Sequence, residues 1–148
     1  MSTTVSDLLR IKGSNVETIT RSETVLEAIR RMEKQHIGCL AVVTKAGKLS
    51  GIITERDCLW KIVASGKSPK THLVKDAMTL LRQMRTVTPS QTVEECMVLI
   101  SGRRHRHLPV LDRGALAGMI SIGDVVKTQL DAQQAMIDSL EKYITGTF

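Results

Sequence analysis

Aromatic residues are scarce in this chain of 148 residues, which contains one Trp, one Tyr and one Phe. Proteins that bind single-stranded nucleic acid stack its bases on aromatic side chains, and this chain has too few of them for that role. No apolar run approaches the roughly 18 residues that span a bilayer. Residues 1–13 are too polar for a signal peptide. We therefore expect a cytoplasmic protein that does not act at a membrane.

Cysteine is also scarce. Cys39, Cys58 and Cys96 are odd in number and include no close pair. Disulfide frameworks and Cys-rich metal sites both need pairs at short spacing, so neither is expected. The three thiols are expected to be reduced and to lie in or near the core.

Positive charge is in excess, with a formal net charge of +6. A basic balance favours anionic partners such as nucleic acid, an acidic membrane surface or phosphorylated small molecules. The densest basic cluster is "RRHRH", and in an extended strand Arg104 and Arg106 would point to one face. Arginine suits phosphate because its guanidinium donates paired hydrogen bonds.

The sequence repeats itself with a period of roughly 67–68 residues. "TRSETVLEAIRRM" (20–32) aligns with "TPSQTVEECMVLI" (88–100), and "GKLSGIITERD" (47–57) aligns with "GALAGMISIGD" (114–124). Strand-like and helix-like patterns follow one another in the same order in both copies. The sequence therefore predicts an α/β protein (α+β in the arrangement of its elements) made of two β-α-β-β-α units.

The expected elements follow from these patterns. Helices are expected to begin at Thr24, Thr54, Thr92 and Ser121, and T-x-x-E capping boxes join Thr24 to Glu27 and Thr92 to Glu95. Strands are expected at 17–20, 39–43, 49–53, 84–88, 107–111 and 115–120. A short helix is expected at 5–11, ended by Gly13, and the last helix is expected to reach about Ile144.

The domain division follows the repeat. The first unit with its N-terminal helix takes residues 1–64, a linker rich in Gly, Pro and Ser takes 65–76, the second unit takes 77–130, and a helical tail takes 131–148. The tail carries an apolar stripe that must cover its own chain or a second subunit.

The most informative pattern is a doubled motif, "GIITERD" (51–57) and "GMISIGD" (118–124). Each copy has a hydroxyl at a strand-to-helix junction and an aspartate three residues later. One interpretation is a helix cap, in which the hydroxyl and the carboxylate serve the positive helix end. The other is a ligand site, since a carboxylate beside a hydroxyl suits a ribose and its phosphate. Retention of both residues in both copies favours the ligand.

The doubled G-h-h-[T/S]-x-x-D motif and the segment "RHLPV" (106–110) resemble the cystathionine-beta-synthase (CBS) domain. The resemblance covers roughly residues 5–130 and includes "LEKYITG" near the end, as in stand-alone bacterial and organellar proteins with a CBS pair, or Bateman module. It implies two repeats related by pseudo-twofold symmetry, two clefts for AMP, ADP or ATP, and frequent disc-shaped dimers. It also implies a regulatory role in place of a catalytic one.

The resemblance further implies contacts of four kinds with the nucleotide: a carboxylate on the ribose, a hydroxyl on ribose or phosphate, a threonine that lines the cleft, and a segment along which adenine lies. In this order the matching residues are Asp57 and Asp124; Thr54 and Ser121; Thr20 and Thr88; and Arg106, His107, Leu108 and Pro109.

The two repeats are not equivalent. The first has glycine and alanine where the second has Arg106 and Pro109. Arg56 stands where the second repeat has Gly123, and it can reach toward phosphate across the repeats. On sequence alone we therefore rank the site of the second repeat higher, with Arg56 and Arg104 as further candidate contacts.

Other functions have less in their favour. His105 and His107 have no third metal ligand at suitable spacing, and no catalytic triad or carboxylate pair is visible, so neither metal, required cofactor nor enzyme activity is expected. The alternative is a basic nucleic-acid-binding protein that uses the Arg103–His107 cluster, although no helix-turn-helix, zinc-finger or RNP pattern is present. We expect a nucleotide-sensing homodimer that acts on a separate, unidentified protein.

Overall fold

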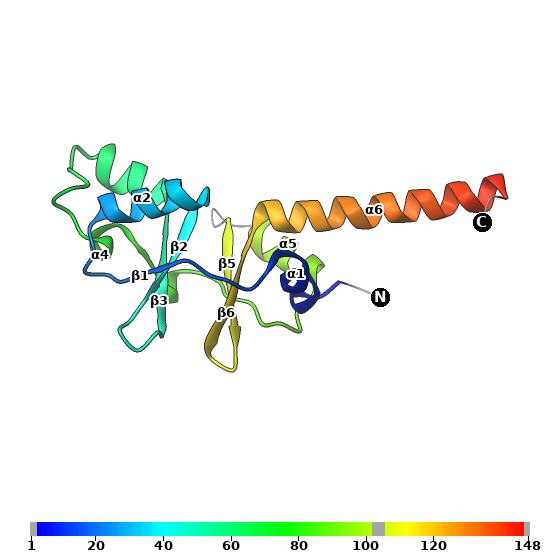
Figure 1. The fold of residues 1–148 in the computed structure, drawn as a ribbon, viewed down its shortest axis with the longest axis horizontal. Helices are drawn as coiled ribbons and strands as arrows, with labels where there is room; N and C mark the ends of the chain where they lie inside the picture. The colour runs from blue at the N-terminus through cyan, green and yellow to red at the C-terminus, as the bar shows by residue number, and fades with distance from the viewer. Residues whose placement is uncertain (1–2, 102–105, 147–148) are drawn as a thin grey trace.

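The computed structural model describes residues 3–101 and 106–146, which form an α/β fold of two repeats (Figure 1). A helix, α1 (Val5–Lys12), precedes the first repeat. That repeat consists of β1 (Thr18–Ile19), α2 (Val25–Gln35), β2 (Cys39–Val43), β3 (Leu49–Thr54), α3 (Glu55–Asp57) and the π-helix η1 (Cys58–Val63). The second consists of α4 (Val74–Ala77), β4 (Thr79–Leu80), the 3-10 helix η2 (Leu81–Gln83), α5 (Val93–Ser101), β5 (His107–Asp112), β6 (Ala115–Ser121) and α6 (Ile122–Thr145).

The expected order of elements is confirmed in the first repeat and modified in the second. The strand expected at 84–88 is reduced to one parallel bridge, between Val87 and Val110. The residues just beyond it bond elsewhere, since the carbonyls of Pro89 and Gln91 accept hydrogen bonds from the first amides of α1. The helix expected at Thr54 also differs, since it widens after one turn into the π-helix η1.

Four strands form the first sheet, in the order β1-β2-β3-β4. β1 runs parallel to β2, while the β2–β3 and β3–β4 pairs are antiparallel. β4 lies beyond the segment 65–76 in the chain, so the second repeat completes the sheet of the first. In the described part of the chain the second sheet consists of β5 and β6, which pair antiparallel with Val110 opposite Gly118.

The repeats also exchange their leading helices. Leu73, just before α4, bridges to Thr24 of the first repeat, and Thr4, just before α1, bridges to Thr92 of the second. The side chains of α1 pack in the core of the second repeat, whereas the sequence division placed this helix with the first. Chain order assigns an element to its neighbour in sequence, but α1 and α4 each bury their apolar face on the other unit.

Two hydrophobic clusters fill the interior, one in each repeat. The first is centred on Ile19, Val25, Leu40, Ile53 and Ile62, and the second on Val5, Val93, Leu108, Ile120 and Val125. All three cysteines are buried free thiols, as expected. Burial raises the pKa of the Cys58 and Cys96 thiols to about 11, so neither is a ready nucleophile.

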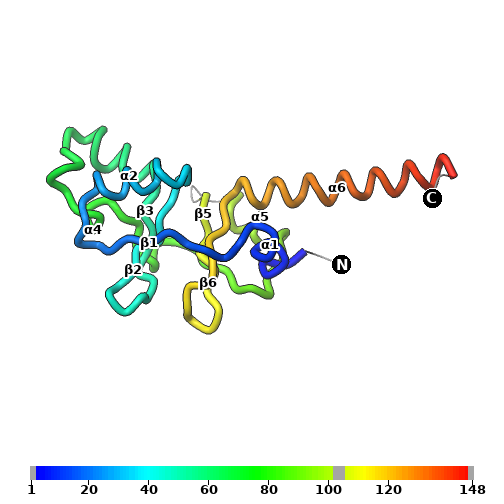
Figure 2. Tube along the Cα trace, viewed as in Figure 1, coloured from blue at the N-terminus to red at the C-terminus, as the bar shows by residue number. Residues whose placement is uncertain are grey.

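The last helix, α6, extends far beyond the body of the molecule (Figures 1 and 2). Its end agrees with the sequence expectation, since it runs to Thr145 and is capped by Gly146 in the left-handed conformation. Val125 is its buried residue, and the apolar side chains beyond it are exposed. Within residues 3–101 and 106–146, no helix combines the length and hydropathy needed to cross a membrane.

Candidate functional site

Both copies of the doubled motif lie where a strand turns into a helix. Thr54 ends β3 and Ser121 ends β6, and each hydroxyl accepts the amide of the aspartate three residues on, at 3.1 and 3.2 Å. Asp57 and Asp124 return the bond, accepting the amides of Thr54 and Ser121 at 3.0 and 2.9 Å. These are complete capping boxes, so the helix-cap interpretation is realised in both copies. Because a carboxylate offers about four acceptor positions, the boxes leave room for further contacts.

Asp57 is the more enclosed of the two carboxylates, with 8% of its surface exposed. Lys61, one helical turn further on, forms an ion pair with its Oδ1 atom at 3.0 Å. Thr79 of β4 donates to the same carboxylate at 3.2 and 3.3 Å. Neither partner was predicted from the sequence. The spacing of four residues on a helix could have identified Lys61. Nothing in the neighbouring sequence identifies Thr79, which reaches Asp57 only because β3 pairs with β4.

A cavity of about 780 Å³ opens beside this carboxylate, between the two repeats. The first repeat contributes Thr54, Arg56 and Asp57 to its wall, and the second contributes Arg106 and His107. Five of the predicted site residues are thus brought together. The complete lining is Gly38, Ile52, Thr54, Glu55, Arg56, Asp57, Trp60, Lys61, Thr79, Gln83, Arg106 and His107.

The charges of this cavity are mixed but positive in sum. Arg56, Lys61 and Arg106 supply three cations, against the carboxylates of Glu55 and Asp57. Such a wall suits a ligand that has hydrogen-bond donors at one end and negative charge at the other.

Ser121 and Asp124, the second copy of the motif, have a different partner. The ammonium group of Lys12, at the end of α1, forms an ion pair with Asp124 Oδ2 and donates to the carbonyl of Met119 at 2.6 Å. Partial burial raises the pKa of Asp124, but hydrogen bonds from Lys12 and Ser121 outweigh it and lower the pKa below its ordinary value. Lys12 was not anticipated, because 112 residues separate it from Asp124.

The other predicted residues that the structure describes lie apart from the cavity. Thr20 and Thr88 contact nearby serines, Ser22 and Ser90, at 3.4 and 3.3 Å between hydroxyl oxygens. Leu108 points into the second core, and Pro109 is buried beside it. Arg103, Arg104 and His105 lie outside the described residues, so Arg106 and His107 are the described members of the basic cluster.

His107 connects the cavity with the second motif, since it lines the former and pairs with Ser121 across β5 and β6. Burial lowers the pKa of His107, and the nearby Lys12 lowers it further, against the opposing effect of Asp124. The folded protein therefore favours the neutral form of the His107 imidazole.

This gives a prediction for stability against pH. The unfolded state takes up the His107 proton at its ordinary pKa of about 6.5, before the folded state does. Stability is therefore expected to fall as the pH drops below about 6.5 toward the lower pKa of the folded state. His107→Gln should flatten urea-unfolding free energies across this range, whereas His36→Gln, at an exposed position, should leave the slope in place. An unchanged slope in His107→Gln would contradict the prediction.

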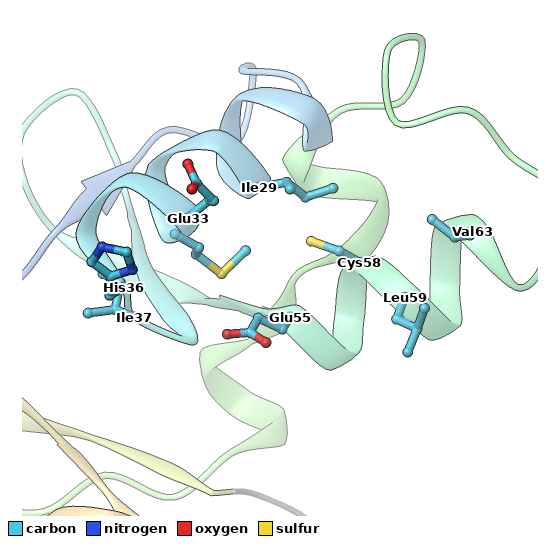
Figure 3. Close-up of a pocket in the computed structure, with 9 residues that line it drawn as sticks. Ile29, Glu33, His36, Ile37, Glu55, Cys58, Leu59 and Val63 are labelled. Atoms are coloured by element: carbon cyan, nitrogen blue, oxygen red, sulfur yellow. The ribbon is translucent and has the colours of Figure 1, made fainter.

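A second, apolar hollow of about 460 Å³ lies between α2 and the helix formed by α3 and η1. Figure 3 shows the side chains of the two helices around it. Leu59 and Val63 remain about half exposed, and none of the predicted ligand residues in the described part of the chain lines it. The lining residues are Ile29, Met32, Glu33, His36, Ile37, Glu55, Cys58, Leu59 and Val63.

Comparisons with known proteins agree with this architecture. The sequence profile of the CBS domain matches residues 5–64 and 73–131, so the chain belongs to the CBS-domain family. Both matches begin close to an exchanged helix, α1 or α4. These matches do not favour the alternative of a nucleic-acid-binding protein.

Several relatives are similar over most of the chain. The mitochondrial CBS domain-containing protein CBSX3 of Arabidopsis thaliana is 39% identical over 154 residues, 99% of this chain and 74% of its own. A structure of a protein with CBS domains from Burkholderia ambifaria has a TM-score of 0.82 at 42% identity, covering 88% of this chain and 96% of its own. A hexameric CBS-CP12 protein from bloom-forming cyanobacteria has a TM-score of 0.74 at 30% identity, covering 85% and 67%.

Proposed function

We propose that this protein is a regulatory module that binds an adenosine nucleotide between its two repeats and thereby modulates a separate partner protein. The observation that carries the proposal is the cavity of about 780 Å³, where Asp57 of the doubled motif lies with cations of both repeats. Its size falls within the roughly 300–1,000 Å³ of small-molecule sites. Membership of the CBS family favours adenosine as the nucleoside.

The chemistry of the wall supports a nucleotide. Asp57 is an acceptor for the two ribose hydroxyls, and Thr54 stands beside it. Arg56, Lys61 and Arg106 are donors for phosphate oxygens, with the paired geometry of guanidinium available from two of them. This assignment differs from the ranking by sequence, because Arg106 and His107 border the first motif as well as the second.

Because residues of both repeats form the cavity wall, ligand binding can regulate the protein. A ligand that contacts both repeats binds best when they hold one relative placement, and it shifts the population toward that placement. A partner protein can respond to the change. We propose that the chain has this role without a catalytic step or a required cofactor.

We further propose that the protein is a homodimer. The exposed apolar side chains of α6 form a stripe that includes Leu130, Ile137 and Leu140. The exposure of these residues, at 47–59%, favours a second subunit over α1 as the surface that covers this stripe. A twofold dimer is the commonest assembly of a soluble homo-oligomer.

Thermal unfolding with nucleotides tests the proposed function. A ligand that binds only the folded state stabilises it by about 2.7 kcal/mol at a hundredfold excess over Kd. If Kd is about micromolar, millimolar AMP, ADP or ATP is expected to raise the Tm by several degrees. GTP and CTP serve as controls. The absence of a shift with every adenosine nucleotide, repeated by calorimetry, would refute the proposal.

The binding affinities of three variants test where the ligand binds. Asp57→Ala removes the ribose acceptor and is expected to weaken binding about ten- to hundredfold. Arg106→Ala, at an exposed position that leaves the core intact, should weaken AMP binding about tenfold and adenosine binding little. Asp124→Ala should cost less than Asp57→Ala. A larger loss at Asp124, with full binding in Arg106→Ala, would move the site to the second motif.

A further inference from the structure

The two motif carboxylates differ in where their lysine partners come from. Asp57 pairs with Lys61, four residues away on the same helical segment. Asp124 pairs with Lys12, which belongs to the N-terminal helix. A ligand that displaces Lys61 from Asp57 therefore breaks an ion pair within one helical segment, whereas one that displaces Lys12 from Asp124 breaks a link between distant parts of the chain.

Lys12 is held at this place by the docking of α1. Leu9 packs directly on Gly118, the first residue of the second motif, where an added Cβ would lie 2.7 Å from Leu9 Cδ2. Gly13 then ends the helix with a positive φ of 100°, and its amide donates to the Leu9 carbonyl at 2.7 Å. The motif glycine thus makes room for the helix that presents the lysine.

The contact occupies the part of the carboxylate that a ribose needs. Asp124 Oδ2 already accepts the amide of Ser121 and the ammonium group of Lys12. A ribose diol that donates one hydrogen bond to each carboxylate oxygen needs a free position on Oδ2, and on Asp124 this is the position that Lys12 holds. Lys12 and Asp124 keep 35% and 24% of their side-chain surface exposed, so the ion pair is open to exchange.

Release of Asp124 leaves Lys12 with an unpaired charge. A nucleotide brings its own anion, and the long lysine stem with three donors can turn to a phosphate. A nucleoside brings none, so its binding leaves the ammonium without an anionic partner. The same residue therefore opposes adenosine and accommodates AMP.

We propose that Lys12 determines the specificity of the second motif for nucleotides over nucleosides. Its ion pair with Asp124 competes with the ribose of an unphosphorylated nucleoside, whereas its ammonium group pairs with the phosphate of a nucleotide. This inference rests on the proposed nucleotide function and extends it to a second site. It also links that site to α1, because the lysine that moves is the last residue of this helix.

Calorimetric titration of the full chain with AMP and with adenosine tests the proposal. The experiment uses Asp57→Asn as background, so that the second motif dominates binding. There, Lys12→Met is expected to tighten adenosine binding about three- to tenfold and to weaken AMP binding by a similar factor. Arg10→Met, on the same helix but paired with Asp7 in solvent, is the control for lost charge and should leave the AMP-to-adenosine ratio unchanged.

The outcomes separate this inference from the proposed function. A fall of the AMP-to-adenosine affinity ratio in Lys12→Met alone supports it. An unchanged or increased ratio, or the same fall in Arg10→Met, overturns it even if nucleotides bind. If no adenosine ligand binds the unmodified protein, the proposed function fails and the specificity role of Lys12 fails with it. Hydrogen exchange gives a second readout, since Lys12→Met should lower protection of the Gly13 amide without ligand, and unchanged protection counts against the link to α1.

Discussion

Replacing Gly51 with alanine is expected to lower the free energy of unfolding by about 3 kcal/mol. The added Cβ would overlap the backbone carbonyl of Thr79 and lie 2.8 Å from Met78 Cε. A backbone atom in a paired strand cannot move aside unless the β3–β4 ladder, with Gly51 opposite Leu80, opens. Because β4 also brings Thr79 to Asp57, nucleotide binding should weaken together with stability. Urea unfolding and AMP titration measure the two effects.

Gly118→Ala is the matched control, since this glycine has the same place in the second motif. The three atoms nearest to its Cβ would all belong to the Leu9 side chain, which can adopt another rotamer. We expect a loss of about 1 kcal/mol. If Gly51→Ala is tolerated as well as Gly118→Ala, the close packing of β4 on the first motif is wrong.

Truncation after Thr128 is expected to raise the Kd of the dimer at least tenfold. It removes Leu130, Ile137, Leu140 and Ile144, which are 47–80% exposed in the single chain. Full burial of one such side chain contributes about 1.5–3 kcal/mol, and about 1.4 kcal/mol is already a factor of ten. Ser121 and Asp124 precede the cut, so the second motif should stay intact. Sedimentation of both chains over a concentration series measures the change.

Point variants in α6 control for the chance that the truncated chain dimerises poorly because it misfolds. Ile137→Ser with Leu140→Ser should weaken the dimer in the same direction, whereas Gln134→Ser with Asp138→Ser, a pair joined at 2.9 Å on the same helix, should have little effect. A full-length monomer at tens of micromolar, or equal dimerisation of the truncated chain, would show that α6 has another role.

Much of the local structure follows from the sequence because its determinants are close together in the chain. The hydroxyl and aspartate of each motif are three residues apart, so the capping boxes at Thr54 and Ser121 form wherever a helix begins there. The repeat, the hairpins and the apolar periodicity likewise depend on spacings that can be counted. The length of α6 was also predictable, since its stripe continues to Ile144 and Gly146 ends it.

Only the tertiary structure decided which distant residues meet at these motifs. Thr79 reaches Asp57 because β4 pairs with β3, and Lys12 reaches Asp124 because α1 buries its apolar face on the second repeat. Arg106 joins the wall beside Asp57 for the same reason, since the cavity lies between repeats. These contacts are fixed by the packing of whole elements, in which burial of apolar surface selects the arrangement and carries the polar side chains with it. These contacts therefore cannot be predicted from the spacing of residues along the chain.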